Sequence, residues 1–411
     1  MASRAVIPFL VAMMLLTGVC NTLLTKYQDM QCVRNCDSED PSERAYFNQP
    51  VLQTAQMFVG ESGCWLVVGL IALYRRYGPG TSPTADGYEA VNTNDNDDAN
   101  APLVDNADGA PKPQDAQGNE TILRGPRILL LALPAICDIL GTTLMNIGLL
   151  LVAASIYQMT RGALVLFVGF FSVIFLKRKL YLFQWLSLLG VVLGVAVVGL
   201  AGVIYHEEKN TEKAAYEGAP ASNGLLVAVG VLLIAGAQIF TATQFVLEEW
   251  ILERSSIEPI RVVGWEGIFG FIVTVTGMLV LHLAIGRTDA GRYGYFDMAE
   301  GWRQLTENRA IGVTSILIMI SIGGFNFFGL SVTRSVSATS RSTIDTCRTL
   351  FIWIVSLGLR WETFKWLQVV GFALLVYFTF LFNGIVQPPF KFLVPDEEVE
   401  ELLPEEPIEH Q

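Results

Sequence analysis

The sequence is short of charge and of the residues that enzymes and metal sites need. Only 16% of its 411 residues are charged, which is low for a soluble protein. It has three histidines and six cysteines, and no Cys/His grouping shows the spacing of a zinc site. No nucleophile–base pair stands out either. These absences argue against an enzyme, a metal site and a bound cofactor, and the net charge of −12 argues against a nucleic-acid partner.

Long apolar runs are what the sequence does contain. Hydrophobic residues make up 52% of the chain, and the mean hydropathy is +0.45. Several runs reach the roughly 20 residues that a helix needs to cross a bilayer. We therefore predict an all-α polytopic membrane protein with ten transmembrane helices. The predicted spans are residues 6–25, 51–74, 127–148, 155–176, 182–205, 224–247, 262–285, 311–332, 338–359 and 366–385.

The first run has a second interpretation. Arg4 precedes it, and small residues at 17–20 would suit signal-peptide cleavage. We favour an uncleaved first helix. Either interpretation places residues 26–50 in a lumen, where Cys32 and Cys36 have the setting for a disulfide, although the sequence leaves their pairing open.

Polar segments separate the apolar runs. Residues 77–126 are rich in Asp, Asn, Pro and Gly and are expected to be a disordered acidic linker. A loop at 206–223, a polar loop at 286–310 and an acidic tail from 387 complete the set. A small excess of Lys and Arg, which includes residues 177–179 and counts Arg334 and Arg341 as loop charges, places both termini in the cytosol. The glycosylation sequon at Asn119 would then stay unused.

The two halves of the chain share features at comparable places. Phe-x-Trp-Leu followed by Gly occurs at 183–190 and again at 364–371. The second predicted span of each half has one glutamate, Glu61 or Glu266, and the fourth has one arginine, Arg161 or Arg348. These matches predict two five-helix repeats, residues 1–205 and 224–386. An odd number of helices per repeat forces opposite orientations, and inverted repeats are typical of secondary transporters.

These features carry a family resemblance. The stretch Ser155–Leu164 (SIYQMTRGAL), the Phe-x-Trp-Leu motifs and the five-plus-five pattern look like the EamA-type drug/metabolite transporter superfamily. More narrowly, the chain resembles the F subfamily of the nucleotide-sugar-transporter-related solute carrier family 35. The resemblance implies a cavity lined by helices 1–4 and 6–9, with helices 5 and 10 peripheral. In related carriers a Gly-Ala-Leu motif in the second half contacts the nucleotide, whereas here Gly162-Ala163-Leu164 lies in the fourth span.

Ionisable groups inside the predicted spans are the candidate site. An arginine at membrane depth costs about 2.5–3.5 kcal/mol on insertion scales, so Arg161 is expected to face a wet cavity or to snorkel to an interface. Glu61 is its expected partner if helices 2 and 4 approach. Asp345 and Arg348, at i and i+3, can meet on one helix face as an anion anchor or as a purely structural pair. Asp138 is a further candidate. The predicted substrate-binding residues are Arg161, Tyr157, Gln158, Thr160, Glu61, Glu266, Gln244, Asn326 and Arg348.

The resulting functional hypothesis is a secondary transporter. It would carry a small polar, anionic or nucleotide-linked metabolite by alternating access, with Arg161 and Arg348 as anion anchors and Glu61 or Glu266 as a proton-coupling or gating group. The alternative is a non-transporting membrane adaptor that recruits partners through its linker and tail. The expected partners are a small-molecule substrate and the lipid bilayer. A homodimer or an adaptor-protein partner is left open.

Two stretches that are predicted to be cytosolic, one in the linker and one in the tail, contain candidate sorting signals. Glu398 followed by Leu402-Leu403 has the form of an acidic dileucine signal, and residues 88–91 have the form of a tyrosine signal. Both forms also arise by chance in acidic sequence. Together they favour the lysosomal membrane over Golgi or mitochondrion, for a multi-pass protein with a cytosolic C-terminus.

Overall fold

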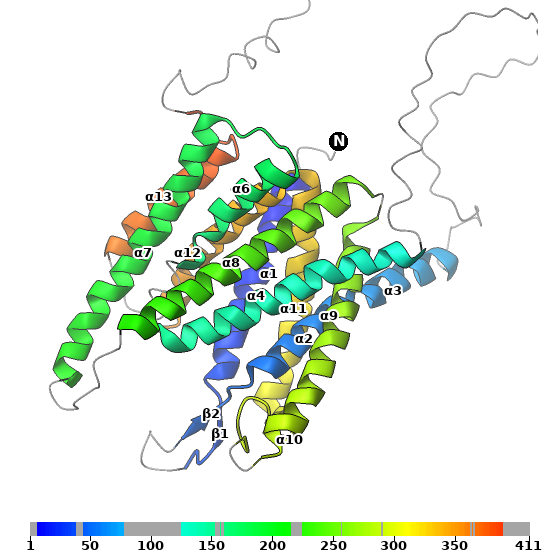
Figure 1. Ribbon diagram of the computed structural model, residues 1–411, viewed down its shortest axis with the longest axis vertical. Coiled ribbons are helices and arrows are strands. Elements are labelled where there is room, and N and C mark those ends of the chain that lie inside the picture. The colour runs from blue at the N-terminus through cyan, green and yellow to red at the C-terminus, as the bar shows by residue number, and fades with distance from the viewer. Residues whose placement is uncertain are drawn as a thin grey trace, which may run out of the picture.

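The computed structural model describes residues 6–37, 44–77, 125–152, 157, 160–214, 224–255, 257–288, 291–361, 364 and 366–388. This part of the chain is almost wholly helical (Figure 1), because a helix satisfies the backbone polar groups of an apolar run internally. The helices are α1 (Val6–Asp29), α2 (Pro50–Ser62), α3 (Cys64–Tyr77), the 3-10 helix η2 (Gly125–Leu131), α4 (Ala132–Leu151), α6 (Leu164–Phe175), α7 (Leu182–Ala214), α8 (Gly224–Glu253), α9 (Pro259–Leu281), the π-helical η3 (His282–Gly286), α10 (Met298–Glu307), α11 (Arg309–Ser335), α12 (Ala338–Gly358) and α13 (Trp366–Phe382).

Helix length and composition confirm a multi-pass membrane protein. Within the described residues, six helices are long and apolar enough to cross a bilayer. Three shorter apolar helices are Leu164–Phe175, Leu182–Val198 and Trp366–Phe382. Each predicted run coincides with helix over at least part of its length. The number of ten spans remains a prediction.

The structure differs from the sequence-based prediction in three places. The chain is not purely helical, because β1 (Cys32–Arg34) pairs antiparallel with β2 (Ala45–Tyr46). The predicted loop at 206–223 begins as helix, since α7 continues to Ala214. The predicted loop at 286–310 contains α10, which starts at an Asp297 cap and is strongly amphipathic. Sequence polarity alone had suggested irregular structure in both places.

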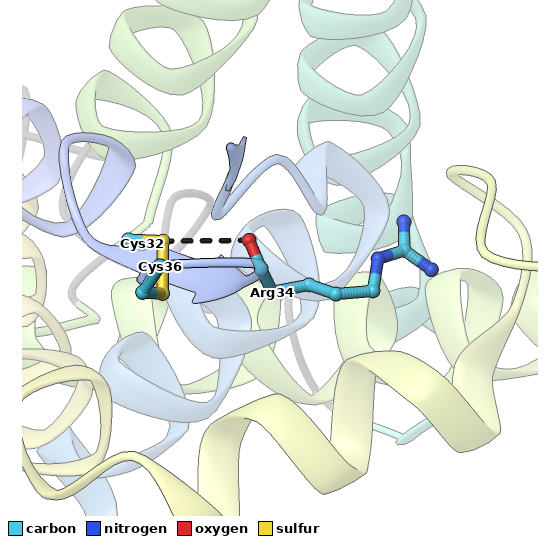
Figure 2. The surroundings of a disulfide bond; sticks show 3 residues. All are labelled: Cys32, Arg34 and Cys36. Atoms are coloured by element: carbon cyan, nitrogen blue, oxygen red, sulfur yellow. Dashed lines mark hydrogen bonds between the residues drawn. A yellow bond between two sulfur atoms is a disulfide. The ribbon is translucent and has the colours of Figure 1, made fainter. Parts of the chain in front are cut away.

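A disulfide closes the hairpin segment. Cys32 and Cys36 are bonded, with their Cα atoms 5.8 Å apart. Figure 2 shows the disulfide beside β1, with the Cys32 sulfur 3.5 Å from the carbonyl oxygen of Arg34 and the Arg34 side chain extending away from it. The hairpin and α10 lie at the end of the bundle opposite the start of α1 (Figure 1). A polar pocket of about 300 Å³ lies here, lined by Cys32, Val33, Arg303, Gln304, Glu307, Asn308 and Arg309.

Helix α10 is held by a capping and ion-pair network outside the spans. The Asp297 side chain accepts a hydrogen bond from the backbone N–H of Glu300 at 3.3 Å. Arg303 Nη2 donates to Glu300 Oε1 at 2.7 Å. These hydrogen bonds from Arg303 lower the pKa of Glu300, whose side chain is only 6% exposed. Glu300 is therefore a buried carboxylate with its cation in place.

The second predicted span is broken where three helices cross. Helix α2 ends at Ser62 and α3 begins at Cys64, so the break is at Gly63. A Cβ on Gly60 would collide with the α11 backbone at Met319, and one on Gly267 would collide with the Ser62 backbone. Glycine therefore allows α2, α9 and α11 to touch backbone to backbone beside Glu61.

Most helices pack against a partner from the other half of the chain. Helix α1 packs on α11 and α4 on α8, while α2 packs on α9, α6 on α12 and α7 on α13. Helices α7 and α13 run side by side along one flank of the bundle (Figure 1). Gly194 and Gly371 face each other there, so that the two backbones approach closely.

Candidate functional site

Intramembrane charges fall into two groups, which we call the arginine pole and the carboxylate pole. The arginine pole consists of Arg348 and Asp345 on α12 together with Tyr157 and Arg161, which precede α6. Arg348 Nε lies 3.2 Å from Asp345 Oδ1, and the two side chains are 10% and 12% exposed. The predicted i, i+3 pair is therefore confirmed.

The Arg348 side chain fills a space between three helices. Its guanidinium lies over the Phe325 ring of α11, 4.8 Å from the centroid. On α1, a Cβ added to Gly18 would lie 2.7 Å from Arg348 Cδ. Small Gly18 thus leaves room for a long cation beside an aromatic face, where a guanidinium is electrostatically favoured.

Arg161 lies near Arg348, and among the described residues no carboxylate forms an ion pair with it. It is half-buried, and both it and Tyr157 are within electrostatic range of the Arg348 guanidinium. Within the described residues, no ion pair joins Arg161 to Glu61, so that predicted partnership was wrong. The Tyr157 hydroxyl donates to Met145 Sδ at 3.3 Å. Thr160 is described and Gln158 lies outside the described residues.

The carboxylate pole brings together acids from four helices. They are Glu61 of α2, Asp138 of α4, Glu248 of α8 and Glu266 of α9, and each is within electrostatic range of at least one other. Asn326 of α11 donates to Glu61 Oε1 at 2.5 Å. Glu61 is 3% exposed and Glu266 6%. The predicted residues Glu61, Glu266 and Asn326 therefore meet at the crossing of α2, α9 and α11.

In the part of the chain that the structure describes, one cation, Arg341, lies at this pole. Arg341 Nη1 lies 2.5 Å from Glu248 Oε2, and both side chains are almost completely buried. The guanidinium also lies over the Phe245 ring, 4.2 Å from its centroid. Gln244, a predicted site residue, donates to Glu248 Oε1 at 3.0 Å. Glu248 is therefore held by the Arg341 guanidinium and by the Gln244 amide.

Sequence reasoning missed both members of that pair. Arg341 was counted as a loop charge, yet it is 1% exposed inside α12. The sixth span was ended at Leu247, so Glu248 fell just outside it, whereas α8 continues to Glu253. The polar i, i+4 spacing of Gln244 and Glu248 was the available signal that the helix continues.

A third group of charges ties the segment after α6 to the other half of the chain. Arg178 Nη2 lies 2.6 Å from Oε1 of both Glu249 and Glu253 near the end of α8. Glu249 is buried and accepts a hydrogen bond from the Ala338 backbone N–H at the start of α12, at 3.0 Å. Arg178 is one of the clustered cations at 177–179 that the sequence placed in a short loop.

A multi-pass helical bundle with opposed buried charges near its helix crossings has the form of a solute transporter. The nucleotide-sugar transporter family model matches residues 114–328. An uncharacterized protein of Schizosaccharomyces pombe is 37% identical over 376 residues, which cover 92% of this chain and 97% of that protein. Solute carrier family 35 member F6 of Homo sapiens is 34% identical over 382 residues, which cover 92% and 89%. The Mus musculus protein of that name is also 34% identical, with 94% and 90% covered.

The chain therefore belongs to the F subfamily of solute carrier family 35, the nucleotide-sugar-transporter-related family. It is a multi-pass endomembrane protein and a solute transporter rather than an enzyme. The linker and tail lie largely outside the described residues, as do Asn119, Glu398, Leu402 and Leu403. The adaptor, sorting and glycosylation hypotheses thus stay predictions.

Proposed function

We propose that the protein carries a small anionic, nucleotide-linked metabolite by alternating access, and that the arginine pole holds the anionic group. The proposal depends on the surroundings of Arg161. It lies beside Arg348, and within the described residues Asp345 is the only carboxylate paired with either arginine. A guanidinium stays charged, and its fork of donors matches phosphate and carboxylate oxygens. Two arginines and one carboxylate leave one positive charge for a substrate to neutralise.

The helix pairing supports two inverted repeats, residues 1–205 and 224–386. Exchanging the halves turns the α1–α11 contact into the α8–α4 contact, and both are present. The same exchange turns α2–α11 into α9–α4 and α6–α8 into α12–α1, and these are present as well. The pairs α2–α9, α6–α12 and α7–α13 map onto themselves. A pseudo-two-fold arrangement of this kind places a substrate between the repeats.

Two local features support a conformational cycle. The break at Gly63 lies beside Glu61, and interrupted spans near the midplane are typical of carrier binding sites. Arg178 joins the first half to Glu249 and Glu253 of the second half. These ion pairs bridge the two halves at this end of the bundle, and separating the halves here would require Arg178 to leave both carboxylates. The Cys32–Cys36 disulfide supports a lumenal hairpin and hence cytosolic termini.

The binding role is tested with Arg161→Gln. Purified protein would be screened by thermal shift against nucleoside monophosphates, nucleotide sugars and organic anions, and the stabilising compounds would be used for uptake into reconstituted vesicles. A charge-assisted hydrogen bond contributes about 1.5–3 kcal/mol, so we expect affinity to fall about tenfold or more. The unfolding midpoint without ligand should change little, because Arg161 has no ion-pair partner within the described residues.

Arg261→Gln is the matched control, because Arg261 is 51% exposed and, in the described part of the chain, has Glu258 on the surface as its one ion-pair partner. For Arg348, the double variant Asp345→Asn/Arg348→Gln avoids leaving a buried carboxylate unpaired. Unchanged ligand affinity in both the Arg161 and the double variants would remove the anion-anchor role.

A further inference from the structure

Charge does not balance at the carboxylate pole. Four carboxylates, from Glu61, Asp138, Glu248 and Glu266, accompany one guanidinium, that of Arg341. Glu248 holds that guanidinium at 2.5 Å. If all four acids were ionised, three negative charges would remain inside a membrane. An unpaired ion in a low-dielectric interior is so costly that the group takes up a proton instead.

Glu266 is the acid with the poorest environment for a negative charge. It is 6% exposed. Within the part of the chain that the structure describes, its buried Oε1 has no hydrogen-bond partner. A protonated carboxyl needs one acceptor for its O–H rather than several donors for an anion, so this environment suits the neutral form.

Glu61 lies next to Glu266 at the helix crossing. A Cβ on Gly267, the residue after Glu266, would lie 2.7 Å from Glu61 Cβ, so the two helices touch at these positions. Asn326 donates a single hydrogen bond to Glu61 Oε1. Two carboxylates that share one buried site cannot both ionise without strong repulsion.

The other groups that face this pair reinforce the effect. Asp138 approaches from α4 and Glu248 from α8, and both add negative potential. Arg341 approaches from α12 but is already paired with Glu248. Cys64, at the start of α3, is buried and carries no ion-pair partner within the described residues.

We propose that Glu61 and Glu266 share one exchangeable proton, and that this proton is the coupling ion of transport. Its coupling role rests on the proposed transport function, whereas its presence does not. The two acids belong to the corresponding spans of the two predicted repeats. Separation of α2 from α9 would expose the carboxyls to water and release the proton, so proton release accompanies the same helix movement that opens a path for substrate.

Infrared spectroscopy of the purified full chain tests the site without any substrate. A protonated carboxyl gives a C=O band distinct from that of a carboxylate, and the band shifts in D2O. We expect such a band at neutral pH, and it should disappear on a rise in pH. Wild-type protein that shows no such band would overturn the proposal, and this measurement needs no variant to fold.

Variants locate the proton. If the proton is shared, the single variants Glu61→Gln and Glu266→Gln should each keep the band, because the remaining buried acid holds the proton, and the double variant should remove one carboxyl's worth of it. A loss in each single variant that adds up in the double variant would show two separate protons, and a double variant with the full band would place the band elsewhere. Either result overturns sharing. Glu300→Gln is the matched control, because Glu300 is also buried but is paired with Arg303, and it should leave the band unchanged.

Coupling is measured separately with uridine monophosphate and a uridine diphosphate sugar as probes in reconstituted vesicles. Uptake of a probe that binds should respond to an imposed pH gradient in wild type and lose that response in the double variant Glu61→Gln/Glu266→Gln. Uptake that ignores the gradient in wild type would overturn the coupling role. Failure of both probes to bind, with the infrared band intact, would count against the proposed substrate class while supporting the proton site.

Discussion

The two poles differ in whether their charge can be removed. The arginine pole holds two guanidinium groups, Arg161 and Arg348, against one carboxylate, Asp345. Guanidinium groups do not lose their protons in proteins, so this excess of positive charge is permanent. Among the residues that the structure describes, the carboxylate pole holds four acids against Arg341. Protons can neutralise those acids, so its excess of negative charge can be switched off.

Under the proposed function, this difference would suit the poles to different tasks. A permanent positive charge beside a stacking surface is suited to holding an anion through the cycle. A removable negative charge is suited to sensing proton supply on either side of the membrane. The poles share two helices, because α11 carries Phe325 at the first and Asn326 at the second, and α12 carries Arg348 at the first and Arg341 at the second. A movement of these helices therefore acts on both poles.

Removing Arg341 should have the largest effect on the difference between the two poles. Arg341→Met would leave Glu248 buried without its cation, and breaking a buried ion pair by removing one partner costs about 3–5 kcal/mol. We expect severe loss of folded, monodisperse protein. Arg161→Gln, at the arginine pole, should cost far less because Arg161 has no such partner within the described residues. Size-exclusion chromatography and thermal unfolding of the two variants measure the contrast.

The control for Arg341 is the double variant Arg341→Met/Glu248→Gln. It removes both charges and keeps an amide oxygen to accept the hydrogen bond from Gln244. Replacing a buried pair by uncharged groups of similar volume is often neutral, so most of the stability should return. A double variant as unstable as the single one would mean that the ion pair is not the reason for the loss.

Glycine substitutions test whether the two poles also differ in packing. A Cβ on Gly267 meets the α2 backbone, which cannot move aside, so Gly267→Ala should cost about 1–3 kcal/mol as overpacking. A Cβ on Gly18 meets the Arg348 side chain and Phe325. Side chains can adjust, so Gly18→Ala should cost less stability but weaken ligand binding by displacing Arg348. Thermal unfolding and ligand titration of both variants provide the test, and equal losses of stability would contradict it.

Much of the fold could be predicted from the sequence because apolar length is a strong signal. The long runs, the Asp345–Arg348 pair and the position of Glu61 and Glu266 followed from composition and helical spacing. The hairpin at Cys32–Tyr46 and helix α10 could not be predicted in the same way. Their structure depends on a disulfide, a cap and packing against α11, which polarity does not reveal.

The kinds of residue in the candidate site could be predicted from the sequence, but the partners of those residues could not. Spacing along one helix predicted Asp345 as the partner of Arg348. No sequence rule, however, connects Asn326 with Glu61, which are 265 residues apart. Arg341 was missed for a physical reason. A cation near a helix start looks like an interfacial charge until the end of α8, carrying Glu248, is packed against it.

The smallest effect concerns Glu300, the reference carboxylate outside the membrane. Hydrogen bonds from Arg303 lower its pKa below the ordinary value of 4.5, so in the folded protein Glu300 keeps its charge to lower pH than in the unfolded chain. The unfolded state then binds more protons around that pH, and the contribution of Glu300 to stability is complete above 4.5 and is lost as pH falls through its lowered pKa. The unfolding midpoint of Glu300→Gln should lie slightly below that of wild type at neutral pH, and the gap should close below pH 4.5. A gap that widened on acidification would mean that Glu300 is held in its protonated form, and the contrast between a paired carboxylate and the unpaired acids of the carboxylate pole would lose its reference.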